Sequence, residues 1–252
     1  MKKMLIEGMT SVRAVIKAIR ECGSDRRISR VFVDRQRSRK RSADIKWLGS
    51  LKDEMGFSVE YLDSDGFGKI AGGKTNGGIA AEVSDRTFPP LSDIRIPQKG
   101  FFAILDGIED PYNFGDAVRS LYLCGCDCLV MKERNWMSAA ATVIKASAGT
   151  SELMQAVIAE PEEAVCTLKS AGYRVVCAGI RDSVPCGEAD LARPLLLIIG
   201  GEKRGISASV LSMADLVVRI SYGREFRGSL SAQSAAAVLS YEIMKQNSEA
   251  GM

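Results

Sequence analysis

The chain has 252 residues, and its 46% apolar and 26% charged residues are typical of a globular protein of about two domains. No apolar run approaches the roughly 20 residues that cross a bilayer, and the first residues lack a signal-peptide pattern, so we expect a cytoplasmic protein without a membrane span. Histidine is absent, which excludes triads and dehydrogenases that use imidazole as the base. Seven cysteines form no Cys-x-x-Cys pair, so we expect buried apolar thiols and no metal site.

Residues 1–84 have the pattern of a small α/β domain. A helix with apolar residues on one face begins at Thr10, whose hydroxyl we expect to cap it. The predicted elements that follow are a strand over residues 30–34, a helix from Ser42 to Gly56, and strands near 58–62 and 78–83.

Basic charge is concentrated in this half of the chain. Residues 1–95 carry 19 Lys and Arg against 13 Asp and Glu, a net of +6, whereas the remainder carries 15 against 18, a net of −3. A solvated loop that keeps the protein soluble is one interpretation, but so dense a cluster favours a polyanionic partner. The residues expected to contact that partner are Arg26, Arg27, Arg30, Arg35, Arg37, Arg39, Lys40 and Arg41.

A linker is expected over residues 85–98, where three prolines fall among few periodic apolar residues. In residues 99–252, predicted strands and helices alternate, which argues for a parallel sheet with helices on both faces. The strands are predicted near residues 101–105, 126–131, 173–178, 195–199 and 216–220, and the helices near 113–124, 138–146, 162–171, 207–213 and 231–246.

Residues 68–75 match the Walker A phosphate-loop pattern, with Lys74 as the loop lysine. A phosphate loop must lead into a helix whose N-terminus faces the phosphates. Here Thr75 is followed by a turn and a strand, so a nucleotide-dependent enzyme is kept only as a third hypothesis.

The most informative segment follows the apolar strand at residues 101–105. The chain turns at Pro111 and enters a helix that we expect Asn113 to cap, with Arg119 six residues further on. We expect both side chains to face the rim at the carboxyl end of the strand, which is where open α/β sheets place their chemistry.

Two later segments also join strand ends to polar residues. The apolar strand at 195–199 leads into a glycine-rich turn with Glu202 at its tip, and such glycines let the backbone approach a ligand or another backbone closely. A polar loop after Ile220 carries Ser229 and leads into a helix rich in Ala and Ser, which suits close packing within the fold or across a dimer. Taken alone, either segment could be an ordinary turn or surface helix.

In this order and spacing, the segments resemble the SpoU/TrmH-type RNA ribose 2′-O-methyltransferases of the SPOUT trefoil-knot superfamily. The matching residues are Asn113-x-Gly115-x-x-x-Arg119 in motif one, Gly200-x-Glu202-x-x-Gly205 in motif two, Ile220 to Glu242 in motif three, and the connecting Lys145 to Glu152. The resemblance covers about residues 97–246 and extends weakly upstream, to a domain that looks like the RNA-substrate domain of ribosomal-RNA members.

This resemblance implies an α/β fold with two parts. Residues 99–252 would form a parallel-sheet methyltransferase domain with a deep trefoil knot, and residues 1–84 a small α/β RNA-binding domain that presents the basic cluster. It also implies S-adenosylmethionine as cofactor, a homodimer through the C-terminal domain, and a site built across the interface. By position, the residues that would line the cofactor pocket are Gly200, Ile220 and Leu230.

The resemblance further assigns the chemistry. The family gives activation of the ribose 2′-hydroxyl to the motif-one arginine, Arg119, whose permanent charge can stabilise the developing alkoxide or recruit an RNA phosphate as base. Asn113 would position the nucleotide or the arginine, Glu202 would orient the motif-two loop, and Ser229 would hydrogen-bond in the site.

Motif three departs from the family pattern. Ser221 and Tyr222 replace the usual Pro-Met, Ser231 stands at the usual Asn, and Gln233 at the usual second Ser. Three hypotheses therefore stay open. The first is a 2′-O-methyltransferase of structured RNA, with large-subunit ribosomal RNA favoured over transfer RNA and a resistance-type ribosomal methylation still open. The second is a non-catalytic RNA-binding protein on a decayed fold, and the third is the nucleotide-dependent enzyme.

Overall fold

The computed structural model describes residues 3–73, 75–133, 139–225 and 227–249. The chain divides into two compact units that differ from the predicted boundaries in one stretch. The first unit contains Met1–Thr87 together with Trp136–Leu153, and the second contains Phe88–Asn135 and Met154–Met252. The first unit therefore includes a piece of chain that lies in the middle of the predicted C-terminal domain.

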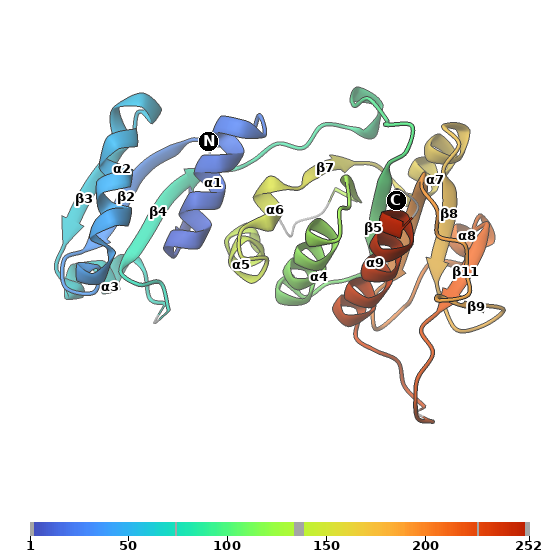
Figure 1. Ribbon diagram of the computed structural model, residues 1–252. Coiled ribbons are helices and arrows are strands. Elements are labelled where there is room, and N and C mark those ends of the chain that lie inside the picture. The colour runs from blue at the N-terminus through green and yellow to red at the C-terminus, as the bar shows by residue number, and fades with distance from the viewer. Residues whose placement is uncertain (1–2, 74, 134–138, 226, 250–252) are drawn as a thin grey trace. The chain divides into compact units, whose positions relative to one another are not determined.

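The first unit is a four-stranded sheet with helices (Figure 1). Strand β2 pairs in parallel with β3 and antiparallel with β4, and β4 pairs antiparallel with β1. The strands in sheet order are β1 (Lys3–Glu7), β4 (Ile79–Ser84), β2 (Ile28–Asp34) and β3 (Ser58–Leu62). The helices are α1 (Met9–Glu21), α2 (Ser42–Met55), α3 (Ser64–Ile70), α5 (Ala140–Ala146) and α6 (Thr150–Leu153), with a short 3-10 turn over Arg39–Arg41.

The predicted N-terminal elements are present, with one correction. Helix α2 begins at Ser42 and ends at Met55, and Gly56, whose left-handed φ is 71°, forms the C-terminal cap, as predicted. Thr10 does not cap α1, because that helix begins one residue earlier, after Gly8. Strand β1 and helix α3 were not predicted. Residues 68–70 of the Walker-like stretch end helix α3, and Lys74 lies outside the described residues.

The second unit is a seven-stranded sheet in which every neighbouring pair of strands is parallel. Its strands in sheet order are β7 (Gln155–Ile158), β6 (Cys128–Met131), β5 (Phe101–Asp106), β10 (Leu195–Gly200), β8 (Arg174–Ala178), β11 (Leu216–Arg219) and β9 (Val184–Pro185). Its helices are α4 (Pro111–Leu123), α7 (Pro161–Ser170), α8 (Ala208–Ser212) and α9 (Ala232–Glu249), and Leu91–Asp93 forms a 3-10 turn. The predicted mixed α/β fold with a parallel sheet is confirmed.

Apolar side chains of the strands are buried against the helices that cover this sheet. Phe102, Ile104, Leu196 and Ile198 pack with Val165 of α7 in one core. Helices α4 and α9 lie side by side, and α9 contacts β10 (Figure 1). Strands β7 and β9 were not predicted, since they have only four and two residues. The start of the helix predicted at residue 138 lies outside the described residues.

The cysteines of this unit include buried thiols. Cys126 and Cys128 are both buried, and burial raises the pKa of the Cys128 thiol to about 12. Cys22 and Cys166 are exposed, so the expectation of buried thiols is only partly correct. Among the described residues, no group of three or more Cys, Asp or Glu side chains could hold a metal ion. No helix in the described part of the chain is long and apolar enough to cross a membrane.

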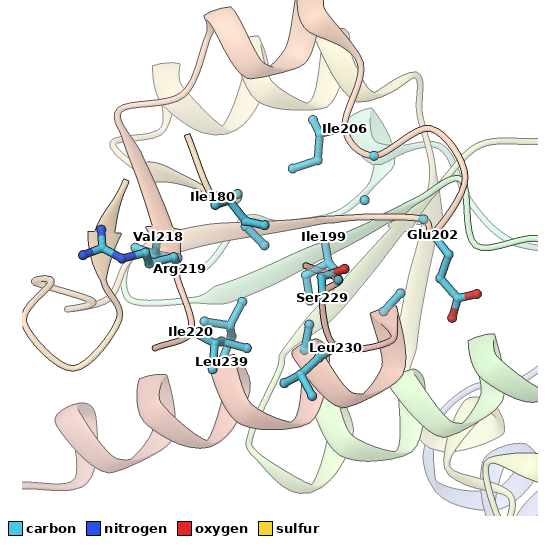
Figure 2. A pocket seen from close by; sticks show the side chains of 18 of the residues that line it. Ile180, Ile199, Glu202, Ile206, Val218, Arg219, Ile220, Ser229, Leu230 and Leu239 are labelled. Atoms are coloured by element: carbon cyan, nitrogen blue, oxygen red, sulfur yellow. The ribbon is translucent and has the colours of Figure 1, made fainter. Parts of the chain in front are cut away.

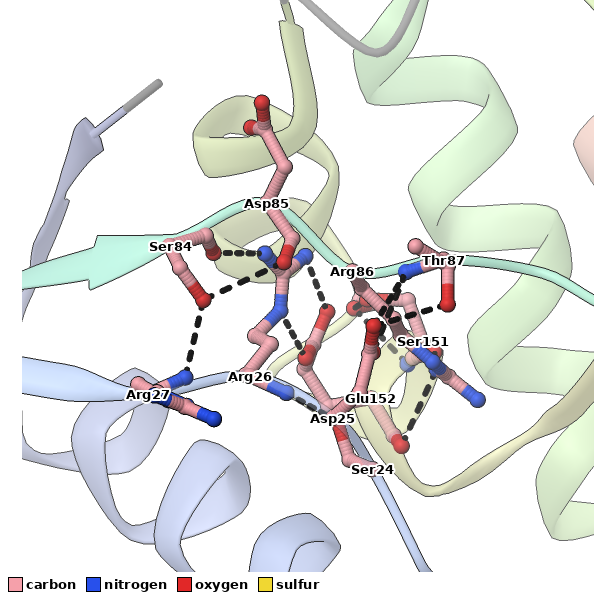
Figure 3. Close-up of polar contacts among 11 residues, drawn as sticks. Ser24, Asp25, Arg26, Arg27, Ser84, Asp85, Arg86, Thr87, Ser151 and Glu152 are labelled. Atoms are coloured by element: carbon pink, nitrogen blue, oxygen red, sulfur yellow. Dashed lines mark hydrogen bonds and ion pairs between the residues drawn. The ribbon is translucent and has the colours of Figure 1, made fainter. Parts of the chain in front are cut away.

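A buried ion pair joins the two stretches of the first unit. Arg26 donates from Nε to Oε2 of Glu152 at 2.5 Å and from Nη2 to Oε1 at 3.0 Å, and both side chains are under 5% exposed (Figure 3). Arg26 also donates to the carbonyl of Ser84, and Arg86 donates to the carbonyls of Ser151 and Glu152. A bidentate geometry with additional hydrogen bonds is what a buried charge pair requires.

Apolar packing holds the same stretch. Ile144 of α5 is buried in the core that contains Ile6, Val15 and Val31. A Cβ on Gly149 would overlap the Cβ of Ala14 in α1, so only glycine allows this approach of the two segments. Residues 140–153 are therefore part of the core of the first unit.

We predict that Glu152→Ala lowers the free energy of unfolding by roughly 3–5 kcal/mol, because it leaves the Arg26 charge buried without its partner. Urea denaturation measures this change. The double variant Arg26→Met with Glu152→Met should recover most of the loss, since it removes both charges together. As a control, Glu21→Ala breaks an exposed ion pair with Lys17 and should cost about 0.5 kcal/mol or less. Equal effects of Glu152→Ala and Glu21→Ala would contradict a buried pair.

Candidate functional site

A candidate site in the second unit lies where three adjacent parallel strands end. A cavity of about 610 Å³ is lined by the residues that follow β8, β10 and β11, namely Gly179 and Ile180, Gly201 and Glu202, and Ile220 and Ser221. The carboxyl ends of parallel strands are the usual ligand-binding edge of an open α/β sheet. The volume is in the range of a pocket for a cofactor-sized molecule.

The lining is mainly apolar side chains and backbone. Figure 2 shows Ile180, Ile199, Ile220, Leu230 and Leu239 around the space, with Glu202 and Arg219 on opposite sides of it. All three residues predicted to line a cofactor pocket, Gly200, Ile220 and Leu230, line this cavity. The loop after β8 was not predicted to take part, because the sequence pattern does not reveal that β8 lies next to β10.

The glycine turn after β10 is shaped by backbone contacts. The amide of Gly201 donates to the carbonyl of Asp106 at 2.6 Å, and the amide of Gly205 donates to the carbonyl of Gly201 at 2.9 Å. A Cβ on Gly201 would overlap the carbonyl of Gly107, and a Cβ on Gly200 would overlap the backbone of Gly205. These glycines thus allow one backbone to approach another closely, as the sequence analysis expected.

A second cavity of about 320 Å³ adjoins the first at the end of β5. It is lined by Asp110, Asn113 and Lys203 among others, and it shares Glu202 and Ala232 with the larger cavity. The side-chain amide of Asn113 donates to Oε1 of Glu202 at 3.5 Å, a long contact between motif one and motif two. Glu202 therefore stands between the two cavities.

The residue that caps α4 is Asp110 and not the predicted Asn113. Asp110 caps the helix by accepting hydrogen bonds from the amides of Tyr112 and Asn113, and Pro111 occupies the first helical position. Asn113 lies inside the first turn, and this leaves its side chain available for Glu202.

The loop before α9 lines the larger cavity. Ser229 and Leu230 are both on its wall, and the hydroxyl of Tyr222 accepts a hydrogen bond from the Leu230 amide at 3.0 Å. Tyr222 is one of the departures from the family pattern, and here it ties the two ends of the loop together. The other departures lie at the start of α9. Ser231 Oγ bonds Ser234 Oγ at 2.9 Å, and Gln233 Oε1 is buried without a partner among the described residues.

Arg119 lies apart from both cavities. Its side chain is exposed on α4, and it has no hydrogen bond or ion pair with any residue in the described part of the chain. Six residues turn an α-helix by about 600°, so the side chains of Asn113 and Arg119 point about 120° apart. The expectation that both face one rim is therefore wrong within a single chain.

The predicted basic cluster is exposed in the first unit, with one exception. Arg26 is buried against Glu152, so the prediction that it contacts RNA is wrong, and its role is structural. Arg30 is exposed but paired with Glu82 and Glu60. Arg41 is partly exposed and bonds Asp44. The remaining predicted residues, Arg27, Arg35, Arg37, Arg39 and Lys40, are exposed.

Comparison with known families identifies the part of the chain that follows the proline-containing stretch. The family model described as the SpoU rRNA Methylase family matches residues 100–241. The chain belongs to this family. The predicted resemblance and the prediction of an RNA methyltransferase are both confirmed at the level of the family.

Individual relatives agree with this assignment. The chain is 31% identical over 180 residues to a putative TrmH family tRNA/rRNA methyltransferase of Staphylococcus saprophyticus, covering 69% of this chain and 72% of the relative. A crystal structure of an RNA 2′-O ribose methyltransferase superposes with a TM-score of 0.78 at 22% identity, covering 97% of this chain and 88% of that one. An AdoMet-bound rRNA methyltransferase of Sinorhizobium meliloti superposes with a TM-score of 0.78 at 19% identity, covering 97% and 87%. At these identities the two structures establish the fold alone.

We predict that Gly201→Ala destabilises this SpoU-family protein by roughly 1–3 kcal/mol, because the added methyl overlaps the Gly107 carbonyl and pushes two strand ends apart. Thermal or urea unfolding measures the change. Gly223→Ala is the matched control, since a Cβ there meets nothing within 4 Å. Indistinguishable stabilities of the two variants would show that the turns after β5 and β10 are not in contact in solution.

Proposed function

We propose that this protein is an S-adenosylmethionine-dependent RNA 2′-O-ribose methyltransferase that acts on large-subunit ribosomal RNA. The observation that carries the proposal is the pair of adjoining cavities with Glu202 between them. The larger is walled by residues of motifs two and three, and the smaller is walled by residues of motifs one and two. A methyl donor and an acceptor nucleotide need two such neighbouring sites.

The residues of the larger cavity fit the proposed cofactor. Its mainly apolar wall suits a flat heterocycle, and the exposed backbone of the Gly200 and Gly205 turn suits recognition through main-chain groups. When bound, the cofactor supplies an activated methyl group. Gly200, Ile220 and Leu230 would hold it, and the AdoMet-bound rRNA methyltransferase of Sinorhizobium meliloti, which shares the fold, supports this choice.

A deep trefoil knot is part of the proposal. Strand β10 lies between β5 and β8, two strands that precede it in the chain. The turn after β10 also packs directly on the turn after β5 through Gly201 and Gly107. Both features support a chain that threads back through its own earlier segments.

We propose that Arg119 acts on a site of the second subunit in a homodimer. Within one chain Arg119 is exposed and lines neither cavity. Arg119 is on α4, which lies beside α9. Both helices expose apolar residues, namely Tyr112 and Leu123 on α4 and Val238 and Tyr241 on α9. Exposed apolar side chains on adjacent helices support an interface there.

The proposed chemistry uses a charge in place of a histidine. The ribose 2′-oxygen would attack the methyl carbon as the bond from that carbon to the donor sulfur breaks, leaving S-adenosylhomocysteine, and the hydroxyl proton must leave as the new bond forms. The guanidinium of Arg119 stabilises the developing alkoxide or holds an RNA phosphate that takes the proton. Asn113 and Glu202 position the nucleotide and the motif-two turn, and Ser229 donates or accepts a hydrogen bond in the site.

The substrate assignment rests on the first unit. We propose residues 1–84 as the RNA-substrate domain, 85–98 as the linker and 99–252 as the methyltransferase domain of a cytoplasmic protein, with residues 140–153 completing the core of the first unit. The exposed basic residues of the first unit favour a large structured RNA. Transfer RNA and a resistance-type methylation of ribosomal RNA are the alternatives within the same reaction.

A non-catalytic RNA-binding protein is the second candidate function, and one observation favours it. Ser231 and Gln233 replace the residues usual in motif three, and the buried Oε1 of Gln233 has no partner within the described residues. Calorimetry with S-adenosylhomocysteine separates the two, since micromolar binding is expected only of the enzyme.

Recombinant protein is predicted to transfer tritiated methyl groups from S-adenosylmethionine to bulk RNA taken from a strain that lacks the gene. Ribosomal RNA of the large subunit should carry the label, because the unmodified site is available there. Mapping 2′-O-methyl positions with and without the gene then identifies the nucleotide. Absence of transfer to any RNA fraction would refute the enzyme and leave the binding protein.

Arg119→Ala is predicted to reduce methyl transfer about 100-fold or more, the scale seen when one charge-stabilising donor is removed. Binding of S-adenosylhomocysteine should be nearly unchanged, because Arg119 does not line the larger cavity. Co-expression with a Gly200→Leu subunit, whose own motif-two turn is disrupted because the added side chain overlaps the Gly205 backbone, should restore transfer in mixed dimers if Arg119 serves the second subunit. Equal loss of transfer and of binding would mean that Arg119 is structural.

A further inference from the structure

An exposed aromatic ring lies beside the arginine-rich loop of the first unit. Tyr61, on the edge strand β3, is 47% exposed. The guanidinium carbon of Arg35 lies 5.8 Å from the centroid of its ring. We call this pair the Arg35–Tyr61 platform. Its two flat groups are of the kinds on which unpaired nucleobases stack.

The fold holds the platform in place. The amide of Arg35 donates to the carbonyl of Leu62 at 2.9 Å, so the loop begins bonded to the end of β3. The buried carboxylate of Asp34 accepts hydrogen bonds from the amides of Gln36 and Arg37 and from the hydroxyl of Ser64. These hydrogen bonds fix the loop before any ligand arrives, which lowers the entropic cost of binding.

Three of the basic residues in the loop that carries the platform have no ion-pair partner among the described residues. Arg35, Arg39 and Lys40 make no ion pair with any residue that the structure describes. Elsewhere in the same unit, exposed arginines do have acidic partners, as Arg13 has Asp44 and Arg20 has Glu54.

The acidic side chains nearest in the chain are largely occupied. Asp44 accepts hydrogen bonds from Arg13 and Arg41, and Asp63 caps α3 by accepting from the Gly66 amide. Three cations of the loop that carries the platform are therefore left to meet an external anion. Phosphates joined to bases combine both chemistries in one chain, whereas an inorganic anion offers charge alone.

We propose that the Arg35–Tyr61 platform is a base-stacking site that selects an unpaired nucleotide of the RNA substrate. A single base stacks on the platform, and the phosphates on either side of it contact Arg39 and Lys40. This inference rests on the proposed action on RNA and deepens it, because it states that the first unit reads a single-stranded loop and not a continuous duplex.

Fluorescence anisotropy with the full-length protein tests the site. The probes are a labelled 12-nucleotide oligoadenylate and a fully paired RNA duplex of 12 base pairs, each titrated at several salt concentrations. Tyr61→Ala should weaken oligoadenylate binding about fivefold or more, the loss expected for one stacked base. The slope of log affinity against log salt concentration should be the same for Tyr61→Ala as for the wild type, since the variant loses no phosphate contact.

Matched variants separate stacking from folding and from charge. Tyr61→Phe keeps the ring and should bind like the wild type, whereas Tyr61→Leu keeps apolar bulk and should bind like Tyr61→Ala. Arg39→Ala should weaken both probes and reduce the salt slope by roughly 0.7. Ile70→Ala removes another exposed apolar side chain of this unit and should change nothing.

The proposal is overturned if Tyr61→Leu binds oligoadenylate like the wild type, or if Tyr61→Ala weakens the duplex as much as the single strand. The methyl-transfer assay on bulk RNA is read separately. If Tyr61 gives the wild type its preference for the single strand but no methyl group is transferred, only the enzymatic proposal is refuted. If methyl groups are transferred but Tyr61 does not contribute to single-strand binding, only the stacking site is refuted.

Discussion

One backbone hydrogen bond, from the Gly201 amide to the Asp106 carbonyl, joins the carboxyl ends of β10 and β5. The candidate site depends on it, because the turn after β10 walls the larger cavity while the turn after β5 walls the smaller one. Any side chain at position 201 would overlap Gly107 and separate them. The site is thus held by main-chain atoms, and the side chains that remain, such as Glu202, are left for selection and chemistry.

The absence of histidine limits what those side chains can do. Neither cavity contains an imidazole, so proton transfer is left to a carboxylate such as Glu202, to a fixed charge or to the substrate itself. Arg119 offers such a charge, yet it lies outside both cavities of its own chain. A reaction that borrows its arginine from a second subunit would proceed only after assembly, and this would link methyl transfer to protein concentration.

Long apolar strands and their glycine turns were predictable, because five or six consecutive buried residues leave a clear pattern. Two-residue β9 and four-residue β7 leave almost none, since their pairing depends on neighbours distant in sequence. Asn113 was predicted to cap α4, whereas the cap is Asp110. Both residue types cap helices, and only the path of the backbone distinguishes them. Likewise, Arg26 looks like its exposed neighbours in sequence, and only its burial against Glu152 reveals a different role.

That buried pair changes how the molecule can be divided. Cutting the chain in the proline-containing stretch after Thr87 would separate the N-terminal residues from Ile144 and Glu152, which complete their core. The released fragment would expose Arg26 and the apolar residues that now pack against Ile144. The remainder of the chain would carry Ile144 and Glu152 without their partners. The first unit is therefore not a detachable module, and any exchange of this unit must replace two separate stretches of sequence at once.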